Sequence, residues 1–216
     1  MKVPQTFLPE RSLEGCVERF METGEYSLLK SCNSFLEQVI HEPYYSSMYD
    51  LGKAIAERIC YDKKDLEALS RRINTNMKGG FKSVAKELGC VGKDYYTVGD
   101  YFRRLGVYLS ALANKILTDE ETITLSPKVP LACLGAYLEK GTLAINSDAE
   151  SRAGFGMKGG KLILKKFPGS IIGALSKGGE IHIERDLGRE IILLDYINLS
   201  DCKAKVYYKG KEVFGR

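Results

Sequence analysis

Glycine, lysine, serine and histidine residues in the second half of this chain have the types and spacing that could perform chemistry. The stretch GFGMKGG at residues 154–160 could hold a phosphate, because exposed backbone N–H groups bind anions. It lacks the G-x-x-x-x-G-K-[ST] pattern, and it leads into an alternating aliphatic run, whereas the Walker loop and the dinucleotide fingerprint both need a helix there. The glycines are therefore interpreted as turns of a repeated backbone, and no cofactor is predicted.

Repetition also explains the basic and nucleophilic candidates. Lys158 and Lys177 lie at equivalent positions of a 19-residue repeat and could form a basic ladder for an anion or an RNA backbone. Exposed lysines also keep a repeat protein soluble and blunt the edges of its sheet, which is the favoured interpretation. Ser151 and Ser170 are equivalent to each other in the same way, so their occurrence needs no nucleophilic role.

Histidine and cysteine do not have the spacing of a metal site. The histidines are His41 and His182, and the six cysteines form no CxxC pair. His182 alternates with aliphatic residues and is expected to face outward, so neither a general base nor any other catalytic residue is predicted. The cysteines are interpreted as buried free thiols. The composition, rich in lysine and glutamate and poor in glutamine, resembles that of heat-adapted proteins, so a disulfide stays an alternative.

Composition favours a globular protein of the cytoplasm. The chain has 216 residues, of which 44% are hydrophobic, and this is enough to bury a core. Charged residues interrupt the apolar windows, and the start of the chain has no apolar signal region, so neither a membrane span nor secretion is predicted. The net charge of +4 is spread evenly, which does not favour nucleic acid as a partner.

Two periodicities divide the chain at about residue 118. Apolar residues three or four positions apart predict six helices between residues 12 and 117. The third is expected to reach Ile59, the fourth to reach Ile73, and the sixth to carry one continuous apolar stripe that ends at Ile116. Short alternating aliphatic runs follow, which are typical of strands. We therefore predict an α+β chain with a helical domain at residues 1–118 and a glycine-rich β-helix domain at residues 119–216.

The β-rich half contains an internal 19-residue repeat. Three segments align without a gap: LGAYLEKGTLAI, AGFGMKGGKLIL and IGALSKGGEIHI, which begin at residues 134, 153 and 172. The glycines that this repeat places at turns are Gly135, Gly141, Gly154, Gly156, Gly159, Gly160, Gly173, Gly178 and Gly179. The aliphatic residues that it places on strands are Leu143, Ile145, Leu162, Leu164, Ile181 and Ile183.

This repeat predicts a short right-handed β-helix, or solenoid, with 19-residue coils. A single coil cannot bury its apolar edge, so equivalent residues of successive coils must stack in columns, about 4.8 Å apart as in neighbouring strands. The residues at positions 143, 162 and 181 would form one interior column, and those at 145, 164 and 183 another. Thr142, Lys161 and Glu180 would point outward. The glycine before each strand suits a positive φ or a close approach between backbones.

The central coil resembles a known family. Its segment SRAGFGMKGGKLIL is similar to the glycine-rich β-helix repeat in the C-terminal domain of the glutamate synthase large subunit and in the C subunit of formylmethanofuran dehydrogenase. The resemblance covers roughly residues 120–208. Tyr137 and Leu175 depart from it, because they occupy the position of Gly156, and the 19-residue step breaks after Gly188. The resemblance implies a structural element that joins domains or subunits, with no active-site residue of its own.

The predicted function is therefore that of a non-enzymatic scaffold or assembly subunit that holds protein partners or copies of itself. The helical part is expected to cap one end of the solenoid and the tail after residue 187 the other, because an open end exposes unpaired backbone groups. Two alternatives stay open. One is an enzyme or ligand-binding protein with its site in the Tyr-rich helical domain, and the other is a weak nucleic-acid-binding module that uses the solenoid lysines.

Overall fold

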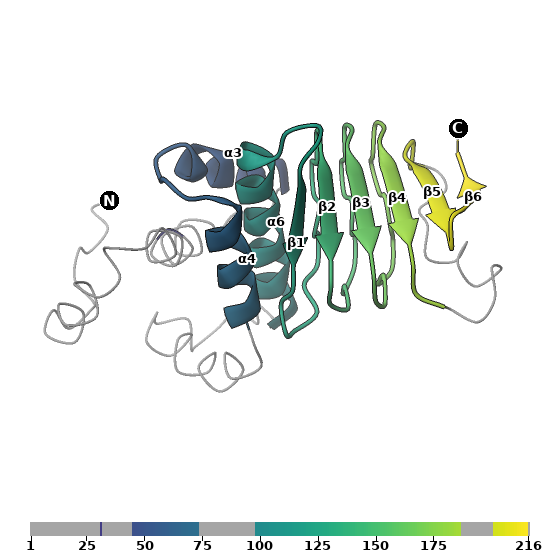
Figure 1. The fold of residues 1–216 in the computed structure, drawn as a ribbon, viewed down its shortest axis with the longest axis horizontal. Helices are drawn as coiled ribbons and strands as arrows, with labels where there is room; N and C mark the ends of the chain where they lie inside the picture. The colour runs from purple at the N-terminus through teal and green to yellow at the C-terminus, as the bar shows by residue number, and fades with distance from the viewer. Residues whose placement is uncertain (1–30, 32–44, 74–97, 187–200, 216) are drawn as a thin grey trace, which may run out of the picture.

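In the part of the chain that the structure describes, three helices precede a row of six strands (Figure 1). The computed structural model describes residue 31 and residues 45–73, 98–186 and 201–215, without the side chains of 98–102. The helices are α3 (Tyr45–Ala56), α4 (Lys63–Arg72) and α6 (Val98–Ile116). The strands are β1 (Thr122–Leu125), β2 (Thr142–Ile145), β3 (Lys161–Leu164), β4 (Glu180–Ile183), β5 (Lys205–Tyr208) and β6 (Lys211–Phe214). The strands belong to a β-solenoid of about three turns, so the predicted α+β class is confirmed.

The ends of two helices differ from the prediction. The third predicted helix ends at Ala56 and not at Ile59, because Lys115 Nζ binds the carbonyl oxygens of both residues, at 2.6 and 2.7 Å, and stabilises a turn there. Helix α4 ends one residue early, since Ile73 is its C-cap and has an extended backbone. The first, second and fifth predicted helices lie outside the described residues, apart from Ser31, which is helical.

Helix α4 owes its start and its orientation to a few residues. Asp62 and Asp65 form a reciprocal capping box, in which each carboxylate accepts a hydrogen bond from the other residue's backbone N–H at 3.0 Å. Leu66 and Leu69 are fully buried, and they fix which side of the helix faces the core. The helix therefore lies against β1 at the beginning of the row of strands, as Figure 1 shows.

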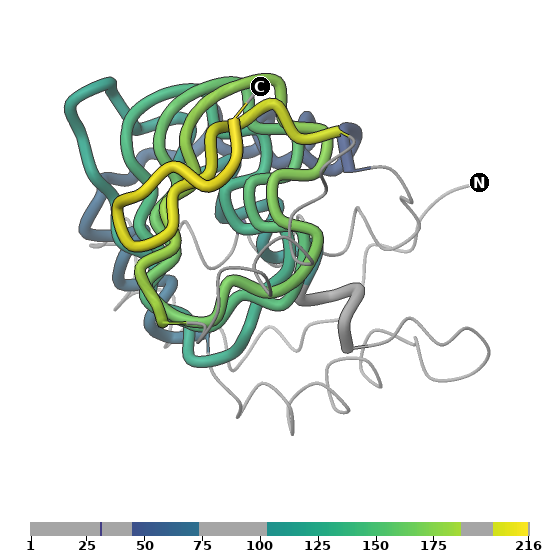
Figure 2. Tube along the Cα trace, turned by 90° about the vertical axis from the view of Figure 1, so that its right-hand side faces the viewer, coloured from purple at the N-terminus to yellow at the C-terminus, as the bar shows by residue number. Residues whose placement is uncertain are grey.

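The strands form a single sheet in chain order. Strands β1 to β5 are parallel, and β6 is antiparallel to β5. We name each coil by its last strand: the first coil (residues 126–145) ends in β2, the second (146–164) in β3 and the third (165–183) in β4. Viewed along the row, the coils lie over one another around a common interior (Figure 2).

The register confirms the predicted columns. Leu143 lies opposite Leu162, which lies opposite Ile181, and all three side chains are fully buried. Ile145, Leu164 and Ile183 form a second buried column in the same way. The outward residues Thr142, Lys161 and Glu180 also lie opposite one another, and they are half-buried. The 19-residue period therefore sets which side chains meet.

Helix α6 is buried on more sides than one stripe would allow. Leu105 and Leu109 are fully buried as expected, but so are Val107 and Ala113 on other sides of the helix. The reason is its position between helices α3 and α4 and the first coil, which enclose it. Gly106 makes this possible, because a Cβ atom there would clash with the backbone carbonyl of Ala132 in the first coil. The predicted stripe is buried at Leu105, Tyr108, Leu109 and Leu112, and the burial on other sides of the helix was not predicted.

The C-terminal end of the row is irregular, as the sequence predicted. Strand β5 follows β4 after a longer step than the earlier ones, since Lys205 pairs with Glu180, and β6 then turns back antiparallel with a bulge beside Val206. One cluster of buried side chains joins the helices to the coils. The predicted division into two domains at residue 118 stays a prediction. No helix among the residues described is long and apolar enough to cross a membrane.

Candidate functional site

The repeat glycines lie at turns, and most of them have a left-handed backbone. Positive φ angles occur at Gly135, Gly141, Gly154, Gly156, Gly160, Gly173 and Gly179. Gly159 and Gly178 do not share this conformation, but a Cβ atom on either would press against a carbonyl oxygen of the preceding coil. Gly160 combines both constraints, since its φ is 67° and a Cβ would lie 2.9 Å from the Lys140 carbonyl oxygen.

Several other residues share the left-handed conformation, and sequence reasoning missed them. Cys133, Arg152 and Ile171 have φ angles of 58°, 54° and 56°, and they occupy equivalent positions of successive coils. Tyr137 and Leu175 have φ angles of 55° and 56°, so they keep the backbone conformation of Gly156, whose position they occupy. The 19-residue spacing was the one signal for these positions, because equivalent residues of a repeat share a backbone conformation. The residue types did not indicate it, since side chains with a Cβ seldom adopt a left-handed backbone.

Ser110 of helix α6 completes the first coil. In the second and third coils, the N–H groups of Gly154 and Gly173 donate to a carbonyl oxygen of the coil before. The first coil has no coil before it, and the N–H of Gly135 donates instead to Ser110 Oγ at 2.9 Å. The same oxygen accepts the N–H of Ala136 at 3.2 Å. A hydroxyl thus replaces the missing carbonyl and satisfies buried donors.

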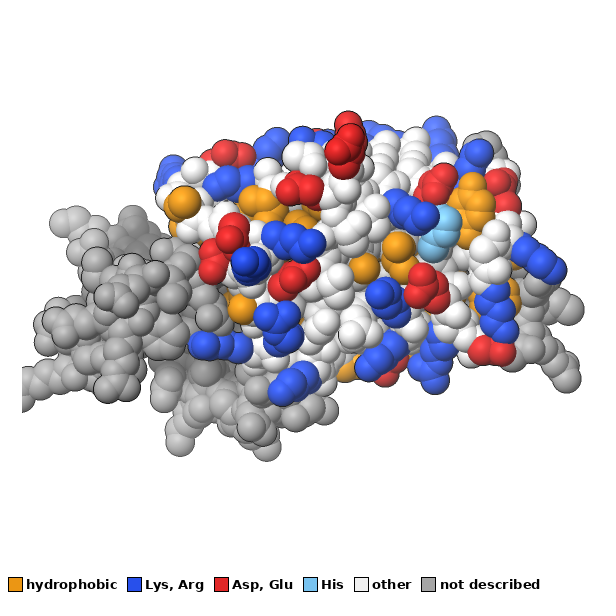
Figure 3. Space-filling view, in the orientation of Figure 1, with side chains coloured by type: hydrophobic (Ala, Val, Ile, Leu, Met, Phe, Trp, Pro, Cys, Tyr) orange, Lys and Arg blue, Asp and Glu red, His pale blue; other side chains and the backbone are white. Residues whose placement is uncertain are grey.

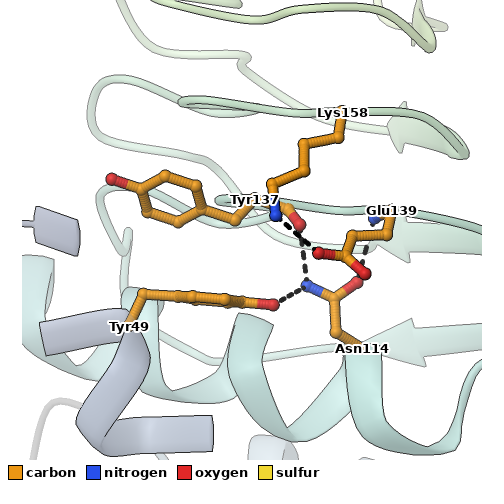
Figure 4. Close-up of polar contacts among 5 residues, drawn as sticks. All are labelled: Tyr49, Asn114, Tyr137, Glu139 and Lys158. Carbon is orange, nitrogen blue, oxygen red and sulfur yellow. Dashed lines mark hydrogen bonds and ion pairs between the residues drawn. The ribbon is translucent and has the colours of Figure 1, made fainter. Parts of the chain in front are cut away.

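Asn114, one turn further along α6, does the same for another backbone group (Figure 4). Its Oδ1 accepts the N–H of Glu139 at 3.1 Å, where the equivalent N–H of Lys158 donates to a carbonyl of the preceding coil. Its Nδ2 donates to the Tyr137 carbonyl oxygen at 3.1 Å and to Tyr49 Oη at 2.7 Å. The amide therefore links α3, α6 and the first coil through three hydrogen bonds.

Helix α4 closes the free edge of strand β1. Glu67 Oε1 accepts the N–H of Thr124 at 2.8 Å, and Ser70 Oγ accepts the N–H of Ser126 at 3.0 Å. The carbonyl oxygen of Ile73 then accepts the N–H of Lys128 at 2.7 Å. Three acceptors spaced along α4 and its C-cap thus bind alternate donors of one strand edge, which would otherwise be free to pair with another chain. We call Glu67, Ser70, Ser110 and Asn114 the capping residues.

A serine of the third coil, Ser176, binds the backbone of the segment that precedes β5. Ser176 Oγ accepts the N–H groups of Lys203 and Ala204, both at 3.0 Å, and lies 3.4 Å from Cys202 Sγ. Its position in the repeat is that of Met157 and Leu138, which are buried apolar residues. The change from an apolar to a hydroxyl side chain therefore coincides with the point where the 19-residue step ends.

Aromatic rings join α3 to the first two coils. The Tyr45 ring lies 4.7 Å from that of Phe155, and the Tyr49 ring lies 4.7 Å from that of Tyr137, between centroids. The Tyr137 ring also fills the space beside Gly156, where a Cβ would be 2.8 Å from it. These tyrosines edge the core instead of lining an open surface.

Burial controls the acidity of the groups in this cluster. It raises the pKa of Tyr49 to about 12, although the hydrogen bond from Asn114 acts in the opposite direction. It also raises the pKa of the Cys133 thiol to about 12, against the opposing effect of Arg103 and Arg152. Both groups are therefore neutral near pH 7. Cys60, Cys133 and Cys202 are free thiols. Cys133 and Cys202 are buried as predicted, whereas Cys60 is exposed, so the prediction of burial is wrong for that cysteine.

One lysine of the predicted ladder, Lys158, is paired with an acidic residue. Lys158 Nζ lies 2.7 Å from Glu139 Oε1 of the first coil, and this hydrogen bond lowers the pKa of Glu139 (Figure 4). On the strands, Glu180 lies in register between Lys161 and Lys205. On the face shown in Figure 3, basic and acidic side chains are correspondingly interspersed over the solenoid. Lys158 and Lys161 thus have acidic neighbours.

The remaining candidates are separate from one another. His182 lies on the outer face of β4, where its ring stacks on Tyr207 at 4.4 Å and its Nε2 is 2.8 Å from Glu180 Oε2. His41 lies outside the described residues. Ser151 and Ser170 pair across successive coils, as expected from their equivalent positions. Among the residues described, no group of three His, Cys, Asp or Glu side chains could hold a metal ion.

Comparisons with family models, with curated proteins and with solved structures give no match for this chain. The resemblance of residues 120–208 to the β-helix domains of glutamate synthase and formylmethanofuran dehydrogenase therefore stays a prediction.

Proposed function

We propose that this protein is a non-enzymatic scaffold or assembly subunit, which holds protein partners or copies of itself together in the cytoplasm. The predicted resemblance of its glycine-rich coil to β-helix domains that join catalytic units supports this role. A stack of coils suits this role, because each coil contacts only its neighbours and the stack offers an extended, regular surface.

The observation that carries the proposal is the way in which the capping residues are used. Ser110 and Asn114 hydrogen-bond to the backbone of the first coil, and Glu67 and Ser70 hydrogen-bond to the edge of β1. A side chain that performs chemistry must be presented to a ligand. These side chains are instead bound to backbone donors of the solenoid, where they stabilise one end of it.

Two further observations weigh against the rival functions. A site in the Tyr-rich helical part would need convergent polar groups in a cleft, yet Tyr49 and Tyr61 hydrogen-bond within the helical part. A nucleic-acid site would need basic side chains available for phosphates, and one of the two lysines of the predicted ladder, Lys158, is paired with Glu139 instead. The structural role is therefore the function that the geometry favours.

The native mass of the protein tests this proposal. A tagged copy of the full chain, expressed in its own host, should elute from a sizing column as a discrete complex well above the 24.1 kDa of one chain. Light scattering on the purified complex should give a fixed stoichiometry. A mass of one chain, both in the host extract and after purification, would contradict the proposal. A monomeric cytoplasmic protein of similar size, carrying the same tag, serves as the control.

A further inference from the structure

Two large apolar side chains of the third coil face solvent. The exposed fraction is 38% for Ile171 and 52% for Leu175, and these are the large hydrophobic residues that stand out as exposed in the described part of the chain. Both lie in the turn that precedes β4. We call this pair the third-coil ridge. Scattered exposed leucines need no explanation, but this pair lies in one turn and has a second unusual property.

That property is the backbone conformation of the third-coil ridge. Ile171 and Leu175 both have a φ of 56°, in the left-handed region that side chains with a Cβ rarely adopt. The conformation is most unfavourable for a β-branched residue such as Ile171. At the position of Leu175 the second coil has Gly156, for which this backbone is unstrained. Large apolar side chains at these two positions are exposed and strain the backbone, so they do not stabilise the folded chain. Their presence therefore points to a role at the surface.

The equivalent positions of the first coil show what covers such a ridge. Tyr137, which corresponds to Leu175, packs against Tyr49 of helix α3. In the second coil, Phe155 packs against Tyr45 of the same helix, and Arg152 donates a hydrogen bond to Tyr45 Oη at 2.9 Å. One amphipathic helix thus lies along this edge of the solenoid, with tyrosines one helical turn apart. The third-coil ridge lies next along the same edge, and the two tyrosine contacts involve only the first and second coils.

Within the third coil, the charged residues that precede β4 are all basic. The chain has no acidic residue between Lys165 and Gly179, while Lys165, Lys166 and Lys177 flank the ridge in sequence. Arg152 occupies the position of Ile171 in the neighbouring coil. A partner with acidic side chains beside its apolar ones would be complementary to this surface.

We propose that the third-coil ridge binds an amphipathic helix of a partner protein, which continues the edge that α3 covers on the first two coils. The apolar residues of that helix, three or four positions apart, contact Ile171 and Leu175, and acidic residues flank them. This inference rests on the proposed scaffold function and specifies which surface holds a partner and by what chemistry.

The experiment uses the full chain in its own host, with the photoreactive residue p-benzoylphenylalanine placed at position 175. A matched variant carries the same residue at position 184, which is exposed just after β4 and lies outside the ridge. We expect at least ten-fold more cross-linked product from position 175. Mass spectrometry should map that product to an amphipathic, acid-flanked helix of another protein. Equal cross-linking from the two positions would overturn the inference, and so would a product within this same chain.

A pair of substitutions at Ile171 tests the charge preference. Ile171→Glu and Ile171→Lys both remove the apolar contact, but only the first places a carboxylate opposite acidic flanks. We expect Ile171→Glu to reduce the cross-link from position 175 several-fold more than Ile171→Lys does. Both variants should keep the circular dichroism spectrum of the parent, because the side chain is exposed. Equal cross-links from the two variants would overturn the charge argument.

The outcomes separate this inference from the function on which it rests. If the native mass exceeds that of one chain and no product forms from position 175, the scaffold function stands and the ridge is not its docking surface. If the native mass is that of one chain, the scaffold function itself fails.

Discussion

At the scale of single residues, this protein ends a repeat by replacing carbonyl oxygens with side-chain oxygens. The Gly154 N–H donates to a carbonyl oxygen of the preceding coil, whereas the equivalent Gly135 N–H donates to the Ser110 hydroxyl. In the same way, the Glu139 N–H donates to the side-chain oxygen of Asn114. Buried donors without a partner are strongly unfavourable, so these side chains are needed wherever a coil is missing.

Ser110→Ala tests this argument. The substitution leaves the N–H groups of Gly135 and Ala136 without the Ser110 acceptor, so we expect a loss of about 1–3 kcal/mol in the free energy of unfolding. Urea denaturation followed by circular dichroism measures this loss. Ser47→Ala, at an exposed position of α3, is the matched control and should change the free energy by less than about 0.5 kcal/mol. Equal values for the two variants would show that Ser110 is not needed as a cap.

Gly160→Val tests the turn before each strand. Valine has to adopt a φ of 67° there, with its Cβ pressed against the Lys140 carbonyl oxygen, so we expect a loss of more than about 2 kcal/mol. The neighbouring variant Lys161→Ala changes a half-buried outer side chain and should have a small effect. Thermal melting distinguishes the two. If Gly160→Val melted at the temperature of Lys161→Ala, the turn would not require glycine.

At the scale of elements, the parallel strands pack through columns of buried side chains, because successive strands pair in the same register. Each coil repeats the same sequence of turns, so residue 162 meets residue 181 because one 19-residue period brings the chain back to the same point. The contacts are distant in sequence but simple in pattern, as expected for a solenoid.

Leu162→Ala and Ile181→Ala, made singly and together, test the column directly. Each side chain is fully buried, so each substitution should lower the free energy of unfolding by about 2–5 kcal/mol. The double variant should depart from additivity by about 0.5 kcal/mol or more, because the two residues line one cavity. The matched pair Lys161→Ala and Glu180→Ala, on the outer face of the same strands, should be nearly neutral. Strict additivity at the buried pair would be inconsistent with the observed register.

The elements that could be predicted from the sequence are those that repeat. The columns through Leu162 and Leu164 followed from three aligned segments, and so did the late arrival of β5. The caps could not be predicted, because a serine or an asparagine within a helix looks the same whether it faces water or a strand edge. The enclosed position of α6 was also hidden, since Gly106 resembles any glycine until the facing carbonyl of Ala132 is known.

At the scale of the whole molecule, helices and coils share one buried core. Helix α6 contributes Leu105, Leu109 and Leu112 to the same cluster as Leu134 and Leu138 of the first coil. The helical part therefore covers the open end of the solenoid with apolar side chains as well as with hydrogen bonds.

The fragment of residues 119–216 shows how far the solenoid depends on this cover. We expect it to be β-rich by circular dichroism, but to bind a hydrophobic dye and to aggregate, because the apolar surface under α6 becomes exposed. The full chain at equal concentration is the control. A monomeric fragment that does not bind the dye and melts at the temperature of the full chain would contradict this expectation, and would favour two independent domains.

The antiparallel return of β6 has a consequence for how this protein can change over evolution. The helices close one end of the stack and the β5–β6 hairpin lies at the other, so a further coil is difficult to add at either end of the stack. The middle has no such restriction, since the steps from β2 to β3 and from β3 to β4 are the same. A tandem duplication of residues 146–164 in the gene would insert a coil between existing coils and lengthen the molecule by about 4.8 Å. The number of coils is thus a variable that gene duplication can alter while both ends stay as they are.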